Sequence, residues 1–251
     1  MKKTQQPAKK ATDNPREMAQ KVLDRVESAA QYSNLALDTA IRRSNMSAED
    51  RALFTTLVYG VIERKLTLDA CIAAHSSRAQ ETLDTGIRNL LRMGIYQMLY
   101  LDRVPDHAAV NETVALAPKR ARGYVNAVLR SFAKDGKRIP VPERESDLTG
   151  YLSVTYSVGV PLCETFLREL GAEKTERILA AFQRPAFPVL RVNPLRTDRD
   201  TLLRRLSDAA LPAEPCRESR MGIRLLRPVP VAELPGFAEG DFFVQDEASQ
   251  L

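Results

Sequence analysis

Side chains that could hold phosphate groups gather in one stretch of the sequence, between residues 119 and 138. Lysine or arginine occupies seven positions there: Lys119, Arg120, Arg122, Arg130, Lys134, Lys137 and Arg138. Ammonium and guanidinium groups bind phosphates with release of counterions, and arginine also stacks on unpaired bases. Charge runs are nevertheless more often solvated helix faces. Charge alone therefore favours solvation over RNA contact, and the neighbouring Tyr124 is as typical of a core as of a stacking surface.

A second pair of candidates stands in the extended run LRVN at 190–193. Arg191 and Asn193 are two residues apart, and side chains two apart on a strand point to the same face. Both could therefore face a nucleic acid. Alternatively, Arg191 pairs with an acidic side chain while Asn193 makes the turn before Pro194. The sequence leaves both interpretations open.

Other reactive side chains occur singly. Three cysteines are far apart in the sequence: Cys71, Cys163 and Cys216. Their odd number and spacing predict neither a disulfide framework nor a metal site, and a reducing cytoplasm is the default location. His75 and His107 have no nucleophile beside them, and Asp246 with Glu247 is typical of the first turn of a helix. No catalytic residue and no metal ligand is expected.

Composition is that of an ordinary globular protein. Of the 251 residues, 44% are apolar and 27% are charged, and this length favours two domains. The formal net charge of +5 permits a nucleic-acid partner without requiring one. No apolar run approaches the roughly 18–20 residues of a membrane span, so no membrane partner is expected. Residues 1–13 are basic and polar without the apolar core of a secretory signal, and we expect a disordered tail.

The stretch from residue 83 to residue 132 is the expected centre of the first domain. Apolar residues recur at helical spacing in its first segment: Leu83, Ile87, Leu90, Leu91, Gly94, Ile95, Met98 and Leu101. This pattern leaves Arg88, Asn89 and Arg92 on the opposite face. Proline at 105 ends the helix, and Asp106 offers an N-cap for the next one. A third helix would turn its apolar face to the same core.

The flanking sequence predicts the remaining elements. Asn14 and Ser47 are N-cap candidates for helices whose apolar residues follow three- and four-residue steps. An all-helical domain of six or seven helices is therefore expected over residues 14–136, followed by a charged, proline-containing linker at 137–147. Residues 148–251 begin with helices and continue with a β-α-β-β order. That order predicts a small α+β unit with a partly open sheet.

The longer strings resemble one protein family. DRALFTTLVYGVIERKLTLD, IRNLLRMGIYQMLYLDRVPDHAAVNETVALA and GYVNAVLR are similar to the NusB-like domain of the RsmB (Sun/Fmu) family of bacterial ribosomal-RNA methyltransferases. The resemblance covers most of residues 14–136. YLSVTYS, LRVNPLRT and LPGFAEGDFFVQDEASQL resemble the segment that leads into the catalytic domain of these enzymes. The resemblance implies an all-α NusB-like domain, then a ferredoxin/RRM-like α+β subdomain at 148–251.

The family makes 5-methylcytosine in small-subunit ribosomal RNA with S-adenosylmethionine and a cysteine nucleophile. This sequence has no glycine-rich loop after a strand, and its cysteines do not match the family's catalytic motifs. We therefore expect a fragment without the Rossmann-like catalytic domain, without cofactor-binding residues and inactive alone. S-adenosylmethionine would serve only the full-length family.

The resemblance implies small-subunit ribosomal RNA as the partner of a cytoplasmic monomer. It strengthens the nine RNA-contact candidates, namely the seven cations between 119 and 138 together with Arg191 and Asn193. A stand-alone NusB-like antitermination factor is the main alternative, and a protein-binding adaptor is a weaker one. The VQDEAS string argues against the first, because it is typical of the entrance to a methyltransferase domain.

Overall fold

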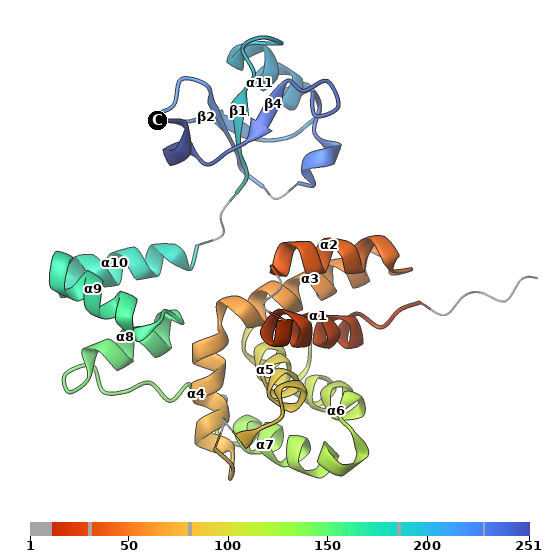
Figure 1. Ribbon diagram of the computed structural model, residues 1–251, viewed down its shortest axis with the longest axis vertical. Coiled ribbons are helices and arrows are strands. Elements are labelled where there is room, and N and C mark those ends of the chain that lie inside the picture. The colour runs from red at the N-terminus through yellow and green to blue at the C-terminus, as the bar shows by residue number, and fades with distance from the viewer. Residues whose placement is uncertain (1–11, 30–31, 80–81, 185–186, 228) are drawn as a thin grey trace, which may run out of the picture. The chain divides into compact units, whose positions relative to one another are not determined.

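The computed structural model describes residues 12–29, 32–79, 82–184, 187–227 and 229–251. The chain divides into two compact units, Met1–Gln183 and Arg184–Leu251, and each has its own hydrophobic core (Figure 1). The tail expected at residues 1–13 lies almost entirely outside the described residues.

Helices alone form the described part of the first unit. They are α1 (Pro15–Ala29), α2 (Ser33–Arg43), α3 (Ala48–Glu63), α4 (Lys65–His75), α5 (Thr85–Tyr100), α6 (Asp106–Leu116), α7 (Arg122–Lys134), α8 (Leu148–Tyr156), α9 (Val160–Leu170) and α10 (Ala172–Phe182), with a short 3₁₀ helix, η2 (Lys119–Ala121). Seven of the α-helices lie between residues 14 and 136, which confirms the predicted all-helical domain.

Two of the three helix starts expected from capping residues are confirmed. The Asn14 side chain accepts a hydrogen bond from the Arg16 backbone N–H at 2.9 Å, and Ser47 accepts one from Asp50 at 3.1 Å. The third expectation was wrong, because α6 begins after Pro105 with no side-chain cap. Its first residue, Asp106, instead forms an ion pair with Lys137.

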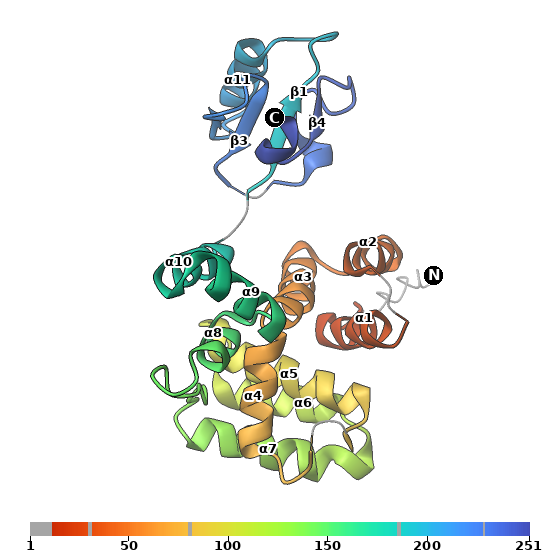
Figure 2. The same cartoon turned by 60° about the vertical axis from the view of Figure 1, so that its left-hand side comes forward.

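Helix α5 is the centre of the first unit. It contacts α1, α3, α4, α6 and α7, and every residue from Asn89 to Met98 is buried (Figure 2). The expectation of one outward polar face was therefore wrong for two residues. Asn89 is only 2% exposed and Arg92 only 3% exposed. Other helices surround α5, and this tertiary packing buries Asn89 and Arg92. The apolar pattern of the helix alone does not reveal it.

Helices α8, α9 and α10 form a small cluster that belongs to the first compact unit. Leu152, Cys163 and Leu179 are its buried core. The Thr67 hydroxyl in α4 donates to the Val154 carbonyl of α8 at 2.6 Å, which ties the cluster to the larger helical core. Compactness therefore divides the chain after residue 183. The expected module limits, 14–136, 137–147 and 148–251, stay a prediction.

The second unit is a four-stranded antiparallel sheet with a helix on one face. Its elements are β1 (Val189–Val192), α11 (Arg199–Asp208), β2 (Ala213–Pro215), β3 (Gly222–Leu225), η3 (Val231–Glu233), β4 (Phe242–Val244) and η4 (Glu247–Gln250). The strand order is β2-β3-β1-β4. Leu202 and Leu206 of α11 pack on the apolar face of the sheet. The predicted α+β class is confirmed, and the strands and α11 follow in the order β-α-β-β-β, one strand more than the predicted β-α-β-β.

Candidate nucleic-acid interface

Helix α7 presents the cations expected at its C-terminal half because its apolar face is held in the core. Val125, Val128, Leu129 and Phe132 are buried, so the residues between them point outward. Arg130 and Lys134 are exposed and four residues apart on the outer face. The Arg130 Nε donates to Asn126 Oδ1 at 2.8 Å, which leaves the rest of its guanidinium group in solvent.

Two grooves meet at Lys134. The α4–α7 groove has a volume of about 720 Å³ and is lined by His75, Ser131, Lys134, Asp135 and Arg138, among others. The α6–α7 groove has a volume of about 410 Å³ and is lined by residues that include His107, Asn111, Arg130 and Lys134. Because Lys134 lines both, its ammonium group can reach an anion in either groove.

The imidazole of His75 forms part of the wall of the α4–α7 groove. Its Nδ1 lies 3.0 Å from the Ser131 Oγ, its Nε2 lies 3.7 Å from the Asp135 carboxylate, and its ring packs edge-on against Phe132. These contacts hold the imidazole in place. The groove therefore combines fixed hydrogen-bonding groups with the mobile charges of Lys134 and Arg138.

Two of the predicted cations have structural partners. Arg122 donates from Nε to the Ala117 carbonyl at 3.0 Å and from Nη2 to the Ala115 carbonyl at 3.1 Å, so it caps the C-terminal end of α6. Lys137 forms the 3.2 Å ion pair with Asp106. Both residues join α6 to α7.

The remaining predicted cations of this region are free to bind anions. Within the described parts of the chain, no carboxylate lies within ion-pair distance of Lys119, Arg120, Arg130, Lys134 or Arg138. All five side chains are exposed. The structure thus separates the seven candidates into two that hold helices together and five that face solvent.

Tyr124 packs partly against the core, as one of the two interpretations predicted, and it also contacts Arg78. Its half-buried ring lies under the Arg78 guanidinium, 4.9 Å from carbon Cζ to the ring centroid, and its hydroxyl lies 2.6 Å from the Ser76 Oγ. Arg78, Arg120 and Tyr124 line a further groove of about 340 Å³. Sequence reasoning missed Arg78, because nothing local in the sequence links it to Tyr124.

The two candidates of the second unit differ in the structure. Arg191 is exposed on β1, and its Nη1 donates to Gln245 Oε1 at 3.3 Å. Asn193 follows the strand, where its Nδ2 donates to the Gly240 carbonyl at 2.9 Å and its Oδ1 accepts from the Leu195 backbone N–H at 3.2 Å. Asn193 therefore forms the turn, as the alternative interpretation predicted, whereas among the described residues Arg191 has no acidic partner.

None of the cysteines is placed to act as a nucleophile, which requires a thiol with a lowered pKa. Burial raises the pKa of the Cys71 thiol to about 12. Burial also raises the pKa of Cys163, and burial together with the Glu247 charge raises the pKa of Cys216. After β4 the chain continues into η4 (Glu247–Gln250), which contains no glycine.

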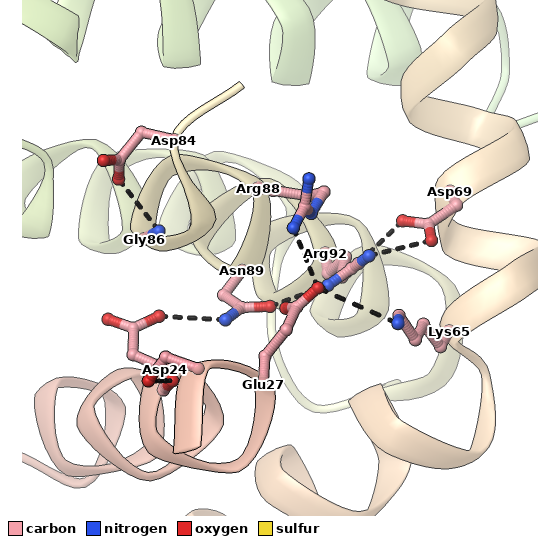
Figure 3. A network of polar contacts seen from close by, with 10 residues as sticks. Asp24, Glu27, Lys65, Asp69, Asp84, Gly86, Arg88, Asn89 and Arg92 are labelled. Carbon is pink, nitrogen blue, oxygen red and sulfur yellow. Dashed lines mark hydrogen bonds and ion pairs between the residues drawn. The ribbon is translucent and has the colours of Figure 1, made fainter. Parts of the chain in front are cut away.

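A buried polar network lies at the junction of α1, α4 and α5 (Figure 3). The Arg92 guanidinium donates to both carboxylate oxygens of Asp69, at 2.6 and 2.8 Å, to Glu27 at 2.7 Å and to Asn89 Oδ1 at 2.9 Å. Asn89 donates in turn to Asp24 at 2.9 Å. The network fixes three helices around one guanidinium group.

The pKa values of two carboxyl groups in this network, Glu27 and Asp24, shift in opposite directions. Burial would raise the pKa of Glu27, but the charges of Arg92, Arg88 and Lys65 together hold it below its ordinary value. Burial raises the pKa of Asp24 despite the hydrogen bond from Asn89. Such perturbed groups also mark functional sites, but here they lie between packed helices, and the network is structural.

Among the described helices, none is long and apolar enough to cross a membrane. Within the described ranges, no three histidine, cysteine or acidic side chains come together in a way that could hold a metal ion.

Comparison with known proteins assigns both parts of the chain. The NusB family matches residues 13–134, and the ferredoxin-like domain described as Methyltr_RsmF/B-like matches residues 162–232. The crystal structure of PH0851 aligns over 96% of this chain and 55% of that one, with a TM-score of 0.67 and 20% identity, and so supports the fold.

Curated relatives are similar in sequence to nearly the whole chain. The ribosomal RNA small subunit methyltransferase B of Pseudomonas syringae pv. tomato is 36% identical over 95% of this chain and 52% of its own length. The probable ribosomal RNA small subunit methyltransferase B of Synechocystis sp. is 34% identical over 94% of this chain and 53% of its own length. The chain thus spans about half the length of these curated relatives. The chain therefore contains a NusB domain followed by an RsmF/B-like ferredoxin-like domain, and over both it is similar to ribosomal RNA small subunit methyltransferases B.

Proposed function

We propose that this chain is the RNA-recognition part of an S-adenosylmethionine-dependent methyltransferase that forms 5-methylcytosine in 16S ribosomal RNA. The observation that supports this most directly is the free charge of Lys134 and Arg138 beside the α4–α7 groove of the NusB domain. Lys119, Arg120 and Arg130 extend this charge along η2 and α7. The chain acts as a monomer in the cytoplasm, where ribosomal RNA is processed.

The cations and the turn residue have different parts in this proposal. The five unpaired cations contact phosphates, since ammonium and guanidinium groups that neutralise phosphates release counterions. Arg122 and Lys137 keep η2, α6 and α7 in register beneath the RNA and contribute their remaining charge to it. In the second unit Arg191 contacts RNA, and Asn193 orders the loop beside it.

The methyl-transfer chemistry is supplied by other parts of the full-length protein. Its methyl donor would be S-adenosylmethionine, but the residues present here offer neither a loop for it nor an activated thiol. This chain therefore binds RNA and does not methylate it alone. A stand-alone antitermination factor is disfavoured, because the RsmF/B-like domain follows the NusB domain.

The test measures binding of a fluorescent 16S ribosomal RNA fragment by anisotropy. We expect the double variant Lys134→Glu/Arg138→Glu to bind roughly tenfold more weakly or worse, because hydrogen bonds to charged groups are worth roughly 1.5–3 kcal/mol each before solvent screening. The matched control is Lys174→Glu/Arg177→Glu, which makes the same charge change on exposed positions of α10.

Equal losses in the two double variants would mean that only net charge matters and would contradict a site at the groove. Failure of the unmodified chain to bind at low salt would contradict the RNA-recognition role itself. In a parallel incubation with labelled S-adenosylmethionine, the same RNA is expected to gain no label. Label on the RNA would overturn the assignment of catalysis to other parts of the protein.

A further inference from the structure

The sheet of the second unit has an open face at strands β1 and β4. Residues directly opposite one another in an antiparallel sheet share a face, and Arg191 stands opposite Phe243. Phe243 is 61% exposed, although large aromatic side chains are usually well covered. The preceding residue, Phe242, is buried in the core that α11 covers. Phe243 therefore presents its ring to solvent from a rigid strand.

The β3 side of the same face is closed by η4. Glu247 of η4 accepts from Arg224 at 2.9 Å and from the Glu218 backbone N–H at 2.6 Å, and Gln250 accepts from the Ser219 hydroxyl at 2.7 Å. The charge of Arg224 is therefore neutralised. The accessible part of the face is confined to the side formed by Arg191 and Phe243.

Arg191 carries a charge that its surroundings do not neutralise. Its side chain bonds to the neutral Gln245 amide, and in the described residues no carboxylate lies within ion-pair distance of it. Gln245 is itself held in place, because its Nε2 donates to the Ser249 carbonyl at 2.8 Å. Gln245 thus orients the guanidinium group on the face of the sheet that also carries Phe243, and no acid neutralises its charge in the described residues.

We propose that Phe243 and Arg191 form a platform on which unpaired bases of single-stranded RNA stack. This rests on the proposed function for the kind of partner, but it places a second contact on the other unit of the chain. A base packs on the exposed phenylalanine ring, and the guanidinium group contacts its phosphate or the next base. A duplex does not fit this chemistry, because its bases are already stacked on one another.

The charges of the second unit favour stacking over long-range attraction. Residues 184–251 contain ten lysine or arginine and ten acidic side chains, so this unit has no net charge. On β4 the exposed Phe243 shares the face of Arg191, whereas the 55% exposed Val244 pairs with Leu190 and points to the opposite face. One ring next to one free guanidinium is better suited to a base and its phosphate than to an apolar protein surface.

The absence of tryptophan from the sequence permits a direct test. In the full chain, Phe243→Trp introduces a single indole whose fluorescence a stacked base quenches. The matched control is Phe237→Trp, at a position that is 46% exposed in a neighbouring loop. An unstructured oligouridylate is expected to quench the tryptophan at 243 and not that at 237. A duplex of equal length is expected to quench neither.

Three results would overturn the platform. These are an unchanged signal at 243 with oligouridylate present at saturating concentration, equal quenching at 237 and 243, or self-association of the chain that Phe243→Ala abolishes while RNA has no effect. A second measurement uses Phe243→Ala, for which we expect roughly 5- to 100-fold weaker oligouridylate binding, and Phe243→Tyr, which retains a stacking ring and should bind normally.

The two proposals fail in different ways. Suppose that Lys134→Glu/Arg138→Glu leaves ribosomal RNA binding intact while oligouridylate quenches the tryptophan at 243. In that case the α4–α7 groove is not an RNA-binding site, and the stacking platform is supported. If the charge variant abolishes binding of the ribosomal fragment but the tryptophan at 243 never responds to oligouridylate, the platform alone is wrong.

Discussion

Arg92 shows how a charged residue can lie inside a helical core. Its guanidinium group meets two carboxylates and one amide oxygen, so its donors are paired although the residue is 3% exposed. A charge removed from water is tolerated only with partners of this kind. The pairing holds α1 and α4 at fixed positions on α5. It therefore favours one packing of the three helices and also stabilises that packing.

Arg92→Met is therefore expected to lower the free energy of unfolding of the first unit by roughly 3–5 kcal/mol, because Asp69 and Glu27 lose their shared buried partner. Urea unfolding followed by circular dichroism would measure this. Arg130→Met removes an arginine from an exposed position on α7 and is expected to change stability by less than about 0.5 kcal/mol. A difference of less than about 1 kcal/mol between the two variants would contradict a structural role for the network.

Single residues also mark what the sequence could not reveal. The positions of the cations could be predicted from the sequence, but their partners could not. The contacts of Arg122 and Lys137 depend on how α6 packs against α7. The burial of Asn89 and Arg92 was missed for the same reason. A helical pattern reports which face is more apolar, and it does not report how many neighbours surround the helix.

Between elements, close contact of α3 with α5 depends on a glycine. A Cβ atom on Gly60 would lie 2.1 Å from the ring of Tyr96, and that ring is confined by Tyr100 at 5.1 Å between centroids. Gly94 of α5 has a similar role against Leu129 of α7. These glycines allow the helices to approach more closely than alanine would permit. The close packing offsets the lower helix propensity of glycine.

Gly60→Ala is expected to destabilise the first unit by roughly 1–3 kcal/mol through overpacking. Gly123→Ala is the matched control, since this helical glycine of α7 has no atom within 4 Å of its missing Cβ. There the change is expected to stabilise by roughly 0.4–1 kcal/mol, because alanine loses less backbone freedom on folding. Thermal unfolding of both variants would show opposite shifts, and a shift of the same sign would contradict this account.

Elements themselves were largely predictable, whereas their arrangement was not. Asn14 and Ser47 signalled helix starts because capping is a local interaction. Short strands are expected at 223–226 and 242–245, and β3 (Gly222–Leu225) and β4 (Phe242–Val244) lie within one residue of these limits. The order β2-β3-β1-β4, however, joins strands that are distant in sequence. The exposed ring of Phe243 follows from that order, so no local pattern could have distinguished it from the buried Phe242.

Across the whole molecule, charge is divided unevenly between the two units. The second unit has no net charge, so the excess of five positive charges lies entirely in residues 1–183. Long-range attraction to RNA is therefore a property of the helical unit. The second unit can add affinity only through short-range contacts such as stacking.

This uneven charge predicts that the salt dependence of RNA affinity changes when the α4–α7 groove is mutated and stays the same when Phe243 is mutated. The slope of log affinity against log salt falls by about 0.7–0.9 for each phosphate contact that is removed. Lys134→Glu/Arg138→Glu should therefore flatten the slope by roughly 1.4–1.8 if each side chain contacts one phosphate. Phe243→Ala should weaken binding by a similar factor at every salt concentration and leave the slope unchanged. Anisotropy titrations of a 16S fragment with a single-stranded end, at four salt concentrations, measure both slopes, and a slope that changes with Phe243→Ala would show that the sheet face also binds through charge.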